Sequence, residues 1–271
     1  MVFVLPLVEG RERGWPWWSI VLLLTTPVFV ELFRRYEVRL AKAGGDPLVP
    51  MEIFQSPGLL RGLGAIMTLY AIATFFLTYS IYLQAALGFT AFQAGLAILP
   101  FSAGFLIAST FSPLFGRWMG TSTPSLAFVL SAGGAVATAL VTASFPAGTI
   151  PPWPLMMPAL ALIGLGMGLS IPTMMRVIIE RVDPNRAGLV GGMFNSTLQV
   201  SAAVGMAVLG GLFYAALGTR SDPATVTHAF STTLLAIAAC HIGGAFLAAG
   251  LGQSARARGK RPALSPSGRA L

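Results

Sequence analysis

Four long stretches of the chain contain no Asp, Glu, Lys or Arg, and they run over residues 62–116, 118–175, 187–219 and 224–255. A helix needs about 20 apolar residues to cross a bilayer, so the first two stretches each have room for two spans joined by a turn. Glycine and proline clusters near residues 88–90, 120–124 and 145–154 mark where such turns fall.

The pattern predicts one short span near the start of the chain and six later ones. The short span covers residues 17–33, with tryptophans at one end and Arg34 and Arg35 at the other as interfacial anchors. All seven runs are apolar on every side and rich in Gly and Ala, without the alternation of barrel strands. We therefore expect an all-α polytopic transmembrane bundle. The six later spans are predicted at residues 60–85, 91–116, 124–145, 153–177, 187–217 and 225–252.

In this seven-span arrangement, most basic residues lie on the same side of the membrane. All Lys and Arg fall on one side except Arg11, Arg13 and Arg220. Because cytoplasmic loops carry the excess of Lys and Arg, the C-terminus is predicted to lie in the cytoplasm and residues 9–16 outside. The protein is therefore expected to be a multi-pass protein of the cell membrane.

The segments outside the spans differ in composition. Residues 1–16 resemble the end of a truncated helix followed by an external loop, because the apolar start is too short to span. Residues 34–60 are predicted to form a cytoplasmic loop with a candidate interfacial helix. Residues 253–271 form a basic tail, expected to be disordered in the cytoplasm.

Composition excludes several function classes. Apolar residues make up 55% of the chain and charged residues only 10%, with a mean hydropathy of +0.77, so a soluble enzyme is not expected. The net charge of +8 arises from residues that flank apolar runs, which favours contact with the lipid bilayer over nucleic acid. Cys240 is the single cysteine and forms no intrachain disulfide.

Groups that could carry chemistry within the spans are few. They are His228, His241, Cys240 and a few tyrosines, too sparse for an enzyme or a metal site, and each histidine is interpreted first as structural. The glycines at 164, 166 and 168 lack the spacing and the preceding strand of a nucleotide loop, so they favour close helix packing. No cofactor is expected.

Weakly polar side chains suggest a path through the bundle. Tyr70, Thr74, Thr78 and Tyr82 recur every four residues, so they line a cavity or form hydrogen bonds between helices. Asn195 and Gln199 share a face with two glycines and must meet protein or water, because carboxamides are costly in lipid. The candidate substrate-path residues are Tyr70, Thr74, Thr78, Tyr82, Gln84, Asn195 and Gln199.

Charged residues cluster at the predicted cytoplasmic ends of the helices. They are interpreted either as an interfacial network of ion pairs or as the latch of a gate. The candidate gate residues are Arg117, Arg176, Glu180, Arg181, Asp183 and Arg186.

Four segments together resemble the major facilitator superfamily, specifically the C-terminal half of its fourteen-helix drug:proton antiporter branch. EGRERGW (9–15) is similar to an external loop of that family, and FRRYEVRLAKAGGDPLVPMEIF (33–54) to the linker before its ninth helix. YLQAALGFTAFQAGLAILP (82–100) is similar to its ninth and tenth helices with their turn. DPNRAGLVGGMFNSTLQVSAAVGMAVLG (183–210) resembles its thirteenth-helix signature.

The sequence departs from that family in two ways. The segment 115–125 keeps only Gly116, Arg117 and Gly120 of a cytoplasmic gating loop and has no acidic residue. The N-terminal carboxylates, main gating loop and antiporter signature of the family have no counterpart. The resemblance therefore assigns 17–33 to the linker helix and 61–252 to the six-helix C-terminal half.

The resemblance implies efflux of hydrophobic or cationic drug-like molecules by proton antiport, with alternating access between this half and an N-terminal half. The proton gradient would drive transport, and the coupling carboxylates would lie in the N-terminal half. The alternative is a non-transporting seven-helix membrane subunit or gene relic that needs a separate N-terminal half. An intramembrane enzyme lacks candidate catalytic groups.

Overall fold

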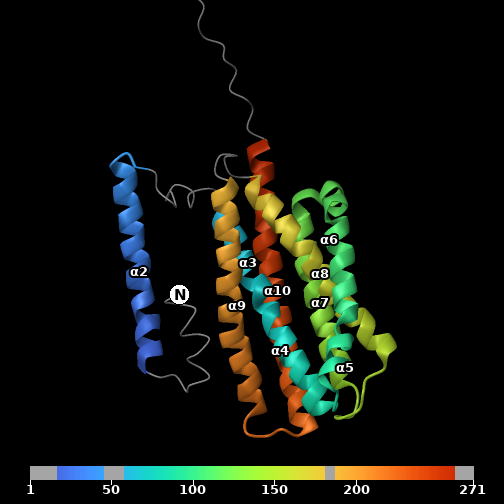
Figure 1. The fold of residues 1–271 in the computed structure, drawn as a ribbon. Coiled ribbons are helices and arrows are strands. Elements are labelled where there is room, and N and C mark those ends of the chain that lie inside the picture. Colours follow the sequence, from blue (N-terminus) through green and yellow to red (C-terminus); the bar gives the residue numbers. More distant parts are fainter. Residues whose placement is uncertain (1–16, 46–57, 181–186, 260–271) are drawn as a thin grey trace, which may run out of the picture.

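A computed structural model of the protein describes residues 17–45, 58–180 and 187–259, and within these ranges it consists of helices joined by short connections (Figure 1). This confirms the predicted all-α polytopic bundle. In chain order the helices are α2 (Trp17–Lys42), α3 (Leu59–Leu69), η2 (Tyr70–Ile72), α4 (Ala73–Ile81), η3 (Tyr82–Ala86), α5 (Ala91–Ala97), α6 (Leu99–Met119), η4 (Gly120–Ser122), α7 (Thr123–Ala143), α8 (Trp153–Ile179), α9 (Ala187–Leu217) and α10 (Pro223–Gly259).

Five stretches of the described residues are long and apolar enough to cross a membrane: Leu59–Ala86, Ala91–Ala143, Trp153–Ile179, Ala187–Leu217 and Pro223–Gly250. The second has 53 residues, which would be about 80 Å long if straight, far more than a bilayer requires. It turns back at Gly120, where φ is +58°, and therefore provides two crossings. The described bundle has six helical rods, as the hydropathy pattern predicts.

The turns between the rods are built from residues that the sequence marks as breakers. Gly88, Gly148 and Gly218 have positive φ, which favours glycine. Just after Gly88, the Thr90 side chain accepts a hydrogen bond from the Gln93 N–H, and the Gln93 side chain accepts one from the Thr90 N–H. This reciprocal cap ends the turn and begins α5.

Asp222 caps the start of α10. Its carboxylate accepts hydrogen bonds from the Thr225 N–H at 3.1 Å and from the Thr225 hydroxyl at 2.8 Å. The bond from the Thr225 N–H is the largest of the causes that hold the pKa of Asp222 below its ordinary value. Because the pKa is lowered on folding, the cap stabilises the protein above the unfolded pKa of about 3.9 and is lost as pH falls through the folded pKa.

We expect the Asp222→Ala variant to melt below the wild type at pH 7 and to approach it at pH 3. The reason is that the protonated carboxyl no longer caps α10 as an anion. Thermal unfolding in detergent at both pH values measures this difference. Asp222→Asn, which keeps an acceptor that does not titrate, should show little pH dependence; an equal pH dependence in Asn and wild type would contradict the assignment.

The α8 helix lies at the centre of one side of the bundle, with α6 and α7 packed along it and hardly touching each other. A Cβ on Gly164 would overlap the Phe101 backbone of α6. One on Gly166 would lie 2.6 Å from the Ala127 carbonyl oxygen of α7. Glycines on two sides of α8 therefore permit backbone-to-backbone contact with both neighbours, which confirms the close-packing interpretation.

The remaining helices pack around α10, which contacts α7, α3 and α9. Aromatic rings fill the core on this side: Tyr82 stacks on Phe230 with ring centroids 4.7 Å apart, and Phe75 stacks on Tyr79 at 5.2 Å. These four rings are buried. They connect the first rod of the bundle to the last one.

Helix α2 stands at one side of the bundle and ends at the level where α3 begins (Figure 1). It continues to Lys42, nine residues beyond the predicted 17–33 span, and exposed ion pairs of Glu31 with Arg34 and Arg35 support the helix where the span was predicted to end. The seventh span stays a prediction. Residues 1–16, 46–57 and 260–271 lie outside the described residues, whereas residues 253–259, predicted to belong to a disordered tail, continue α10 as a helix.

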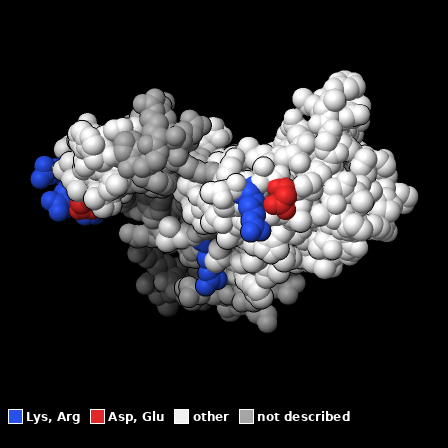
Figure 2. Space-filling model, turned by 90° about the horizontal axis from the view of Figure 1, so that it is seen from below, with Lys and Arg blue, Asp and Glu red and all other residues white. Residues whose placement is uncertain are grey.

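The charges of the described bundle separate to its two ends. Arg61, Arg117 and Arg176 lie at the end where α3 begins and α6 and α8 end, whereas Arg220 lies in the opposite α9–α10 connection. Figure 2 looks onto that opposite end, and most of the visible surface of the described residues is uncharged. These three arginines therefore lie at the end opposite to Arg220, and the orientation of the bundle in the membrane stays a prediction.

Candidate functional site

The candidate functional site is a cavity of about 420 Å³ at mid-length of the bundle, here named the Tyr70 cavity. It lies between the first rod, α6 and α8, and its walls are mostly apolar. Its lining residues are Tyr70, Ile72, Ala73, Phe76, Phe101, Ser102, Phe105, Met167 and Ile171.

Tyr70 reaches this cavity from a break in the first rod. The α3 helix ends at Leu69, Tyr70 has a ψ of 3°, and the 3-10 turn η2 follows before α4 resumes. The Ala73 N–H bonds to the carbonyls of Tyr70 and Ala71 in place of the usual i−4 carbonyl of Leu69. The break therefore sets the direction in which Tyr70 leaves the rod.

The cavity combines aromatic rings with two hydroxyl-bearing residues. The Phe76 and Phe101 rings meet edge to face at 5.1 Å, and Phe101 stacks on Phe105 at 6.5 Å. Ser102 donates a 3.4 Å bond to the Ile98 carbonyl, and Tyr70 is the second polar group. Such a lining suits apolar molecules, and ring faces also attract lipophilic cations.

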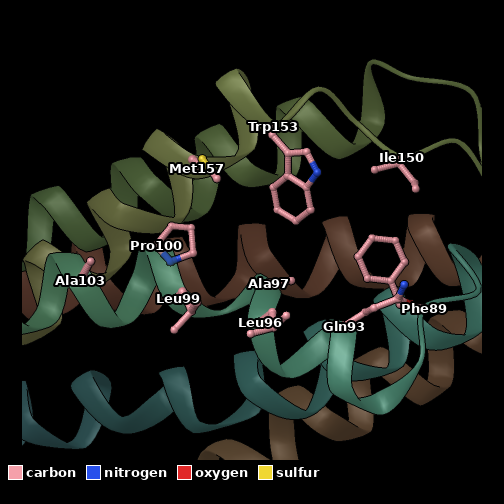
Figure 3. A pocket seen from close by; sticks show the side chains of 10 residues that line it. All are labelled: Phe89, Gln93, Leu96, Ala97, Leu99, Pro100, Ala103, Ile150, Trp153 and Met157. Atoms are coloured by element: carbon pink, nitrogen blue, oxygen red, sulfur yellow. The ribbon is translucent and has the colours of Figure 1, made fainter.

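A second cavity of about 690 Å³, here named the Trp153 pocket, lies at the end of the bundle that carries the Gly88 and Gly148 turns. Figure 3 shows Trp153 and Met157 of α8 facing side chains of α5 and α6 across it. It opens on a different side of α6 from the Tyr70 cavity. Its lining residues are Phe89, Gln93, Leu96, Ala97, Leu99, Pro100, Ala103, Ile150, Trp153 and Met157.

The predicted four-residue stripe does not stay on one face. Thr74, Thr78 and Tyr82 are enclosed in the bundle, whereas Tyr70 lines the cavity. The Thr78 hydroxyl donates to the Thr74 carbonyl of its own helix at 2.9 Å. Gln84 is exposed, and its amide donates to the Ser80 hydroxyl at 2.8 Å.

Asn195 and Gln199 lie on the exposed side of α9. Both fall within the first half of a helix of membrane-spanning length, Ala187–Leu217. Exposed carboxamides at this depth are costly in hydrocarbon, so this side of α9 needs a protein or water neighbour.

The candidate gate residues that the structure describes lie together only in part. The Arg176 guanidinium of α8 donates to the Gly116 carbonyl of α6 at 3.2 Å, and its Nε lies 3.6 Å from the Glu180 carboxylate. A Cβ on Gly116 would lie 2.7 Å from that guanidinium, so the glycine makes the contact possible. Arg117 is exposed. Arg181, Asp183 and Arg186 lie outside the described residues.

Sequence reasoning missed most of the cavity wall. Phe101, Phe105, Met167 and Ile171 are apolar, like the residues that face lipid in the same helices. The four-residue spacing of the two phenylalanines on one span is the available signal. Hydropathy alone does not separate a cavity-facing ring from a lipid-facing one.

Titratable groups do not assemble into a metal site in the described part of the chain. No three His, Cys, Asp or Glu side chains lie close enough there to hold an ion. His228 is exposed near the start of α10, and His241 is fully buried further along the same helix.

Comparisons with known proteins agree with this geometry. A family model described as the Major Facilitator Superfamily matches residues 12–206 and 61–267. The chain is 31% identical to a probable actinorhodin transporter of Streptomyces coelicolor, over 81% of this chain and 38% of that protein. It is 28% identical to the methylenomycin A resistance protein of Streptomyces coelicolor, over 75% of this chain and 42% of that protein.

A third relative is the multidrug resistance protein Stp of Mycobacterium tuberculosis, 28% identical over 81% of this chain and 40% of that protein. The chain therefore spans about two fifths of the length of these curated relatives.

Proposed function

The chain belongs to the major facilitator superfamily, and from this premise we propose that it forms the C-terminal half of an exporter of hydrophobic or cationic small molecules. The names of its relatives, an antibiotic transporter and resistance proteins, support this substrate class. The observation that carries the proposal is the Tyr70 cavity, whose aromatic, uncharged wall fits such molecules.

An N-terminal half, on the same or a separate polypeptide, is proposed to complete the exporter. Asn195 and Gln199 support this, because α9 exposes their carboxamides at a depth where lipid is a poor neighbour. The partner half would cover α9 and close the Tyr70 cavity. The two halves would then alternate access to the cavity by rocking against each other.

Proton antiport and orientation complete the proposal. The charged side chains of the described bundle lie near helix ends and in connections, so we assign the proton-coupling carboxylates to the N-terminal half. The end with Arg61, Arg117 and Arg176 is proposed to face the cytoplasm, together with the C-terminus. There, the contact of Arg176 with Gly116 would act as part of the gate.

Filling the Tyr70 cavity should block transport. Ser102 is an exposed position on the cavity wall, so a Ser102→Trp variant can fold while its indole occupies the space of a substrate. We expect ethidium export in liposomes containing this chain and the N-terminal half to fall at least about tenfold, equivalent to losing one strong contact. Proton flux is followed with a pH dye in the same vesicles.

Leu140→Trp is the matched control, since Leu140 of α7 is 60% exposed and lies outside both cavities. It should transport like the wild type. Unchanged export by a folded Ser102→Trp protein would remove the Tyr70 cavity as the substrate site. No export by the wild-type pair would instead favour a non-transporting membrane subunit.

A further inference from the structure

His241 of α10 lies against the break in the rod that carries Tyr70. Its side chain is fully buried, and its Nε2 atom is 3.2 Å from the Leu69 carbonyl oxygen of α3. A carbonyl only accepts hydrogen bonds, so the geometry assigns the Nε2–H tautomer to His241. This bond joins residues 172 positions apart in the sequence.

The bonded carbonyl is the one that would accept the Ala73 N–H if the α-helix were continuous. The Ala73 N–H, which would bond to Leu69 in a continuous α-helix, turns to the carbonyls of Tyr70 and Ala71. His241 supplies a donor to that carbonyl. Beside the i+3 bond of the 3-10 turn, the imidazole N–H therefore takes the place that the Ala73 N–H has in a continuous helix, and the bond stabilises the broken form.

The imidazole is held in one orientation by its neighbours. The Phe128 ring of α7 meets it edge to face, with centroids 6.0 Å apart and an interplanar angle of 70°. One turn later on α10, Gly244 leaves space for Phe128, because a Cβ there would lie 2.6 Å from its ring. Three helices, α3, α7 and α10, therefore converge on His241.

The opposite neighbour of the break is α9. A Cβ on Gly205 would lie 3.1 Å from the Ala71 Cα, and the Ser201 hydroxyl donates to the Met67 carbonyl at 2.5 Å. The break is thus held from α9 by close packing and from α10 by the imidazole. Tyr70 and Ile72 within it, and Ala73 and Phe76 just after it, line the cavity.

We infer that His241 is a positioning residue of the Tyr70 cavity: its bond to the Leu69 carbonyl holds the 3-10 turn and thereby fixes where Tyr70 and Phe76 meet a ligand. The part of the inference that concerns ligand affinity rests on the proposed function. The part that concerns the break does not, and the two are tested separately.

Hydrogen exchange tests the local role. His241→Phe keeps an aromatic ring beside Phe128 but removes the donor, whereas His241→Gln keeps a donor of similar reach. We expect the amides of residues 67–76 to exchange about tenfold faster in the Phe variant, as for loss of one hydrogen bond, and near the wild-type rate in the Gln variant. His228→Phe, at an exposed site of the same helix, should change nothing in this segment.

Equal exchange of residues 67–76 in the wild type and the Phe variant would overturn the role of the bond. Equally fast exchange in the Phe and Gln variants would also overturn it, because packing of the ring and not the donor would then matter. Should the Phe variant not fold, His241→Asn replaces it, since its amide is too short to reach the Leu69 carbonyl.

Binding of tetraphenylphosphonium to the chain with its N-terminal half tests the role in affinity. His241→Phe should raise the Kd about tenfold, while His241→Gln stays near the wild type. In a Tyr70→Phe background the His241→Phe effect should shrink, because both changes act on the same contact. A lowered melting temperature with an unchanged Kd would show a purely structural role and overturn this part.

A wild-type pair that does not bind tetraphenylphosphonium would overturn the proposed function and the affinity part together. The exchange experiment would still decide whether His241 holds the break.

Discussion

Replacing Gly164 with valine is expected to leave little folded protein. The new Cβ would overlap the carbonyl of Phe101, which belongs to the backbone of α6 and cannot rotate away. Separating α6 from α8 also breaks the contacts of Gly104 and Gly168 along the same interface. Overpacking of this kind costs about 3 kcal/mol, a large part of the total stability of a protein. Thermal unfolding and the monodisperse fraction in detergent measure the loss.

Gly243→Val is the matched control. Gly243 also lies within a spanning helix, but a Cβ there has no neighbour within 4 Å. It should fold with a melting temperature near that of the wild type. Equal loss of folded protein in both variants would mean that valine disfavours the helices generally and that the α6–α8 contact is not responsible.

Arg176→Ala is expected to destabilise the bundle and to loosen the ends of α6 and α8. The guanidinium bonds to the Gly116 carbonyl near the end of α6, which also accepts the Gly120 N–H, and so joins α8 to α6. Losing a charged hydrogen bond at this side chain, 38% exposed, should cost about 1 to 2 kcal/mol. The melting temperature should fall by several degrees, and ethidium export with the N-terminal half should slow.

Two control variants at neighbouring residues distinguish the possible causes of the Arg176→Ala effect. Arg117→Ala removes an exposed arginine from the same end of the bundle and should leave the melting temperature unchanged. Glu180→Gln removes the 3.6 Å ion pair, which is largely exposed and should contribute little. A drop for Glu180→Gln as large as that for Arg176→Ala would move the effect from the Gly116 carbonyl to the ion pair.

The fold of the bundle follows from the sequence because bilayer thickness and charge act on long segments. The uncharged stretches are long enough to count spans, and glycines at 88, 120, 148 and 218 with positive φ mark the turns. Helix ends agree with the pattern to within a few residues, with the exceptions of α2 and α10. Both continue past the apolar run, because a helix does not need to stop where the membrane does.

The cavity could not be predicted in the same way. A spacing of four keeps Tyr70, Thr74 and Thr78 on one face only if the helix is continuous. The 3-10 turn at Tyr70–Ile72 advances about 120° per residue where an α-helix advances about 100°, so positions before and after it change face. The neighbouring sequence does not predict this break, because the side chain that donates to the Leu69 carbonyl, His241, belongs to the last helix.

The contact of Arg176 with Gly116 could not be predicted either, for a related reason. Arg176 and Glu180 are one turn apart, so their proximity is readable from the sequence. The stronger partner of Arg176 is the backbone of Gly116, sixty residues away. Every residue type has a backbone carbonyl, so this partner cannot be recognised in the sequence. It follows only from the place where α6 and α8 cross.

The central place of α8 also governs how the chain is made. Because translation runs from the N-terminus, α6 and α7 are made before α8. They form a hairpin whose two helices hardly contact each other. Until residues 153–179 enter the membrane, we expect glycines such as Gly104 and Gly134 to face lipid. Their small size then gives no stability, because it serves close contact with the α8 backbone. We therefore expect the hairpin to be an unfinished intermediate during translation, which becomes part of a stable protein when α8 inserts.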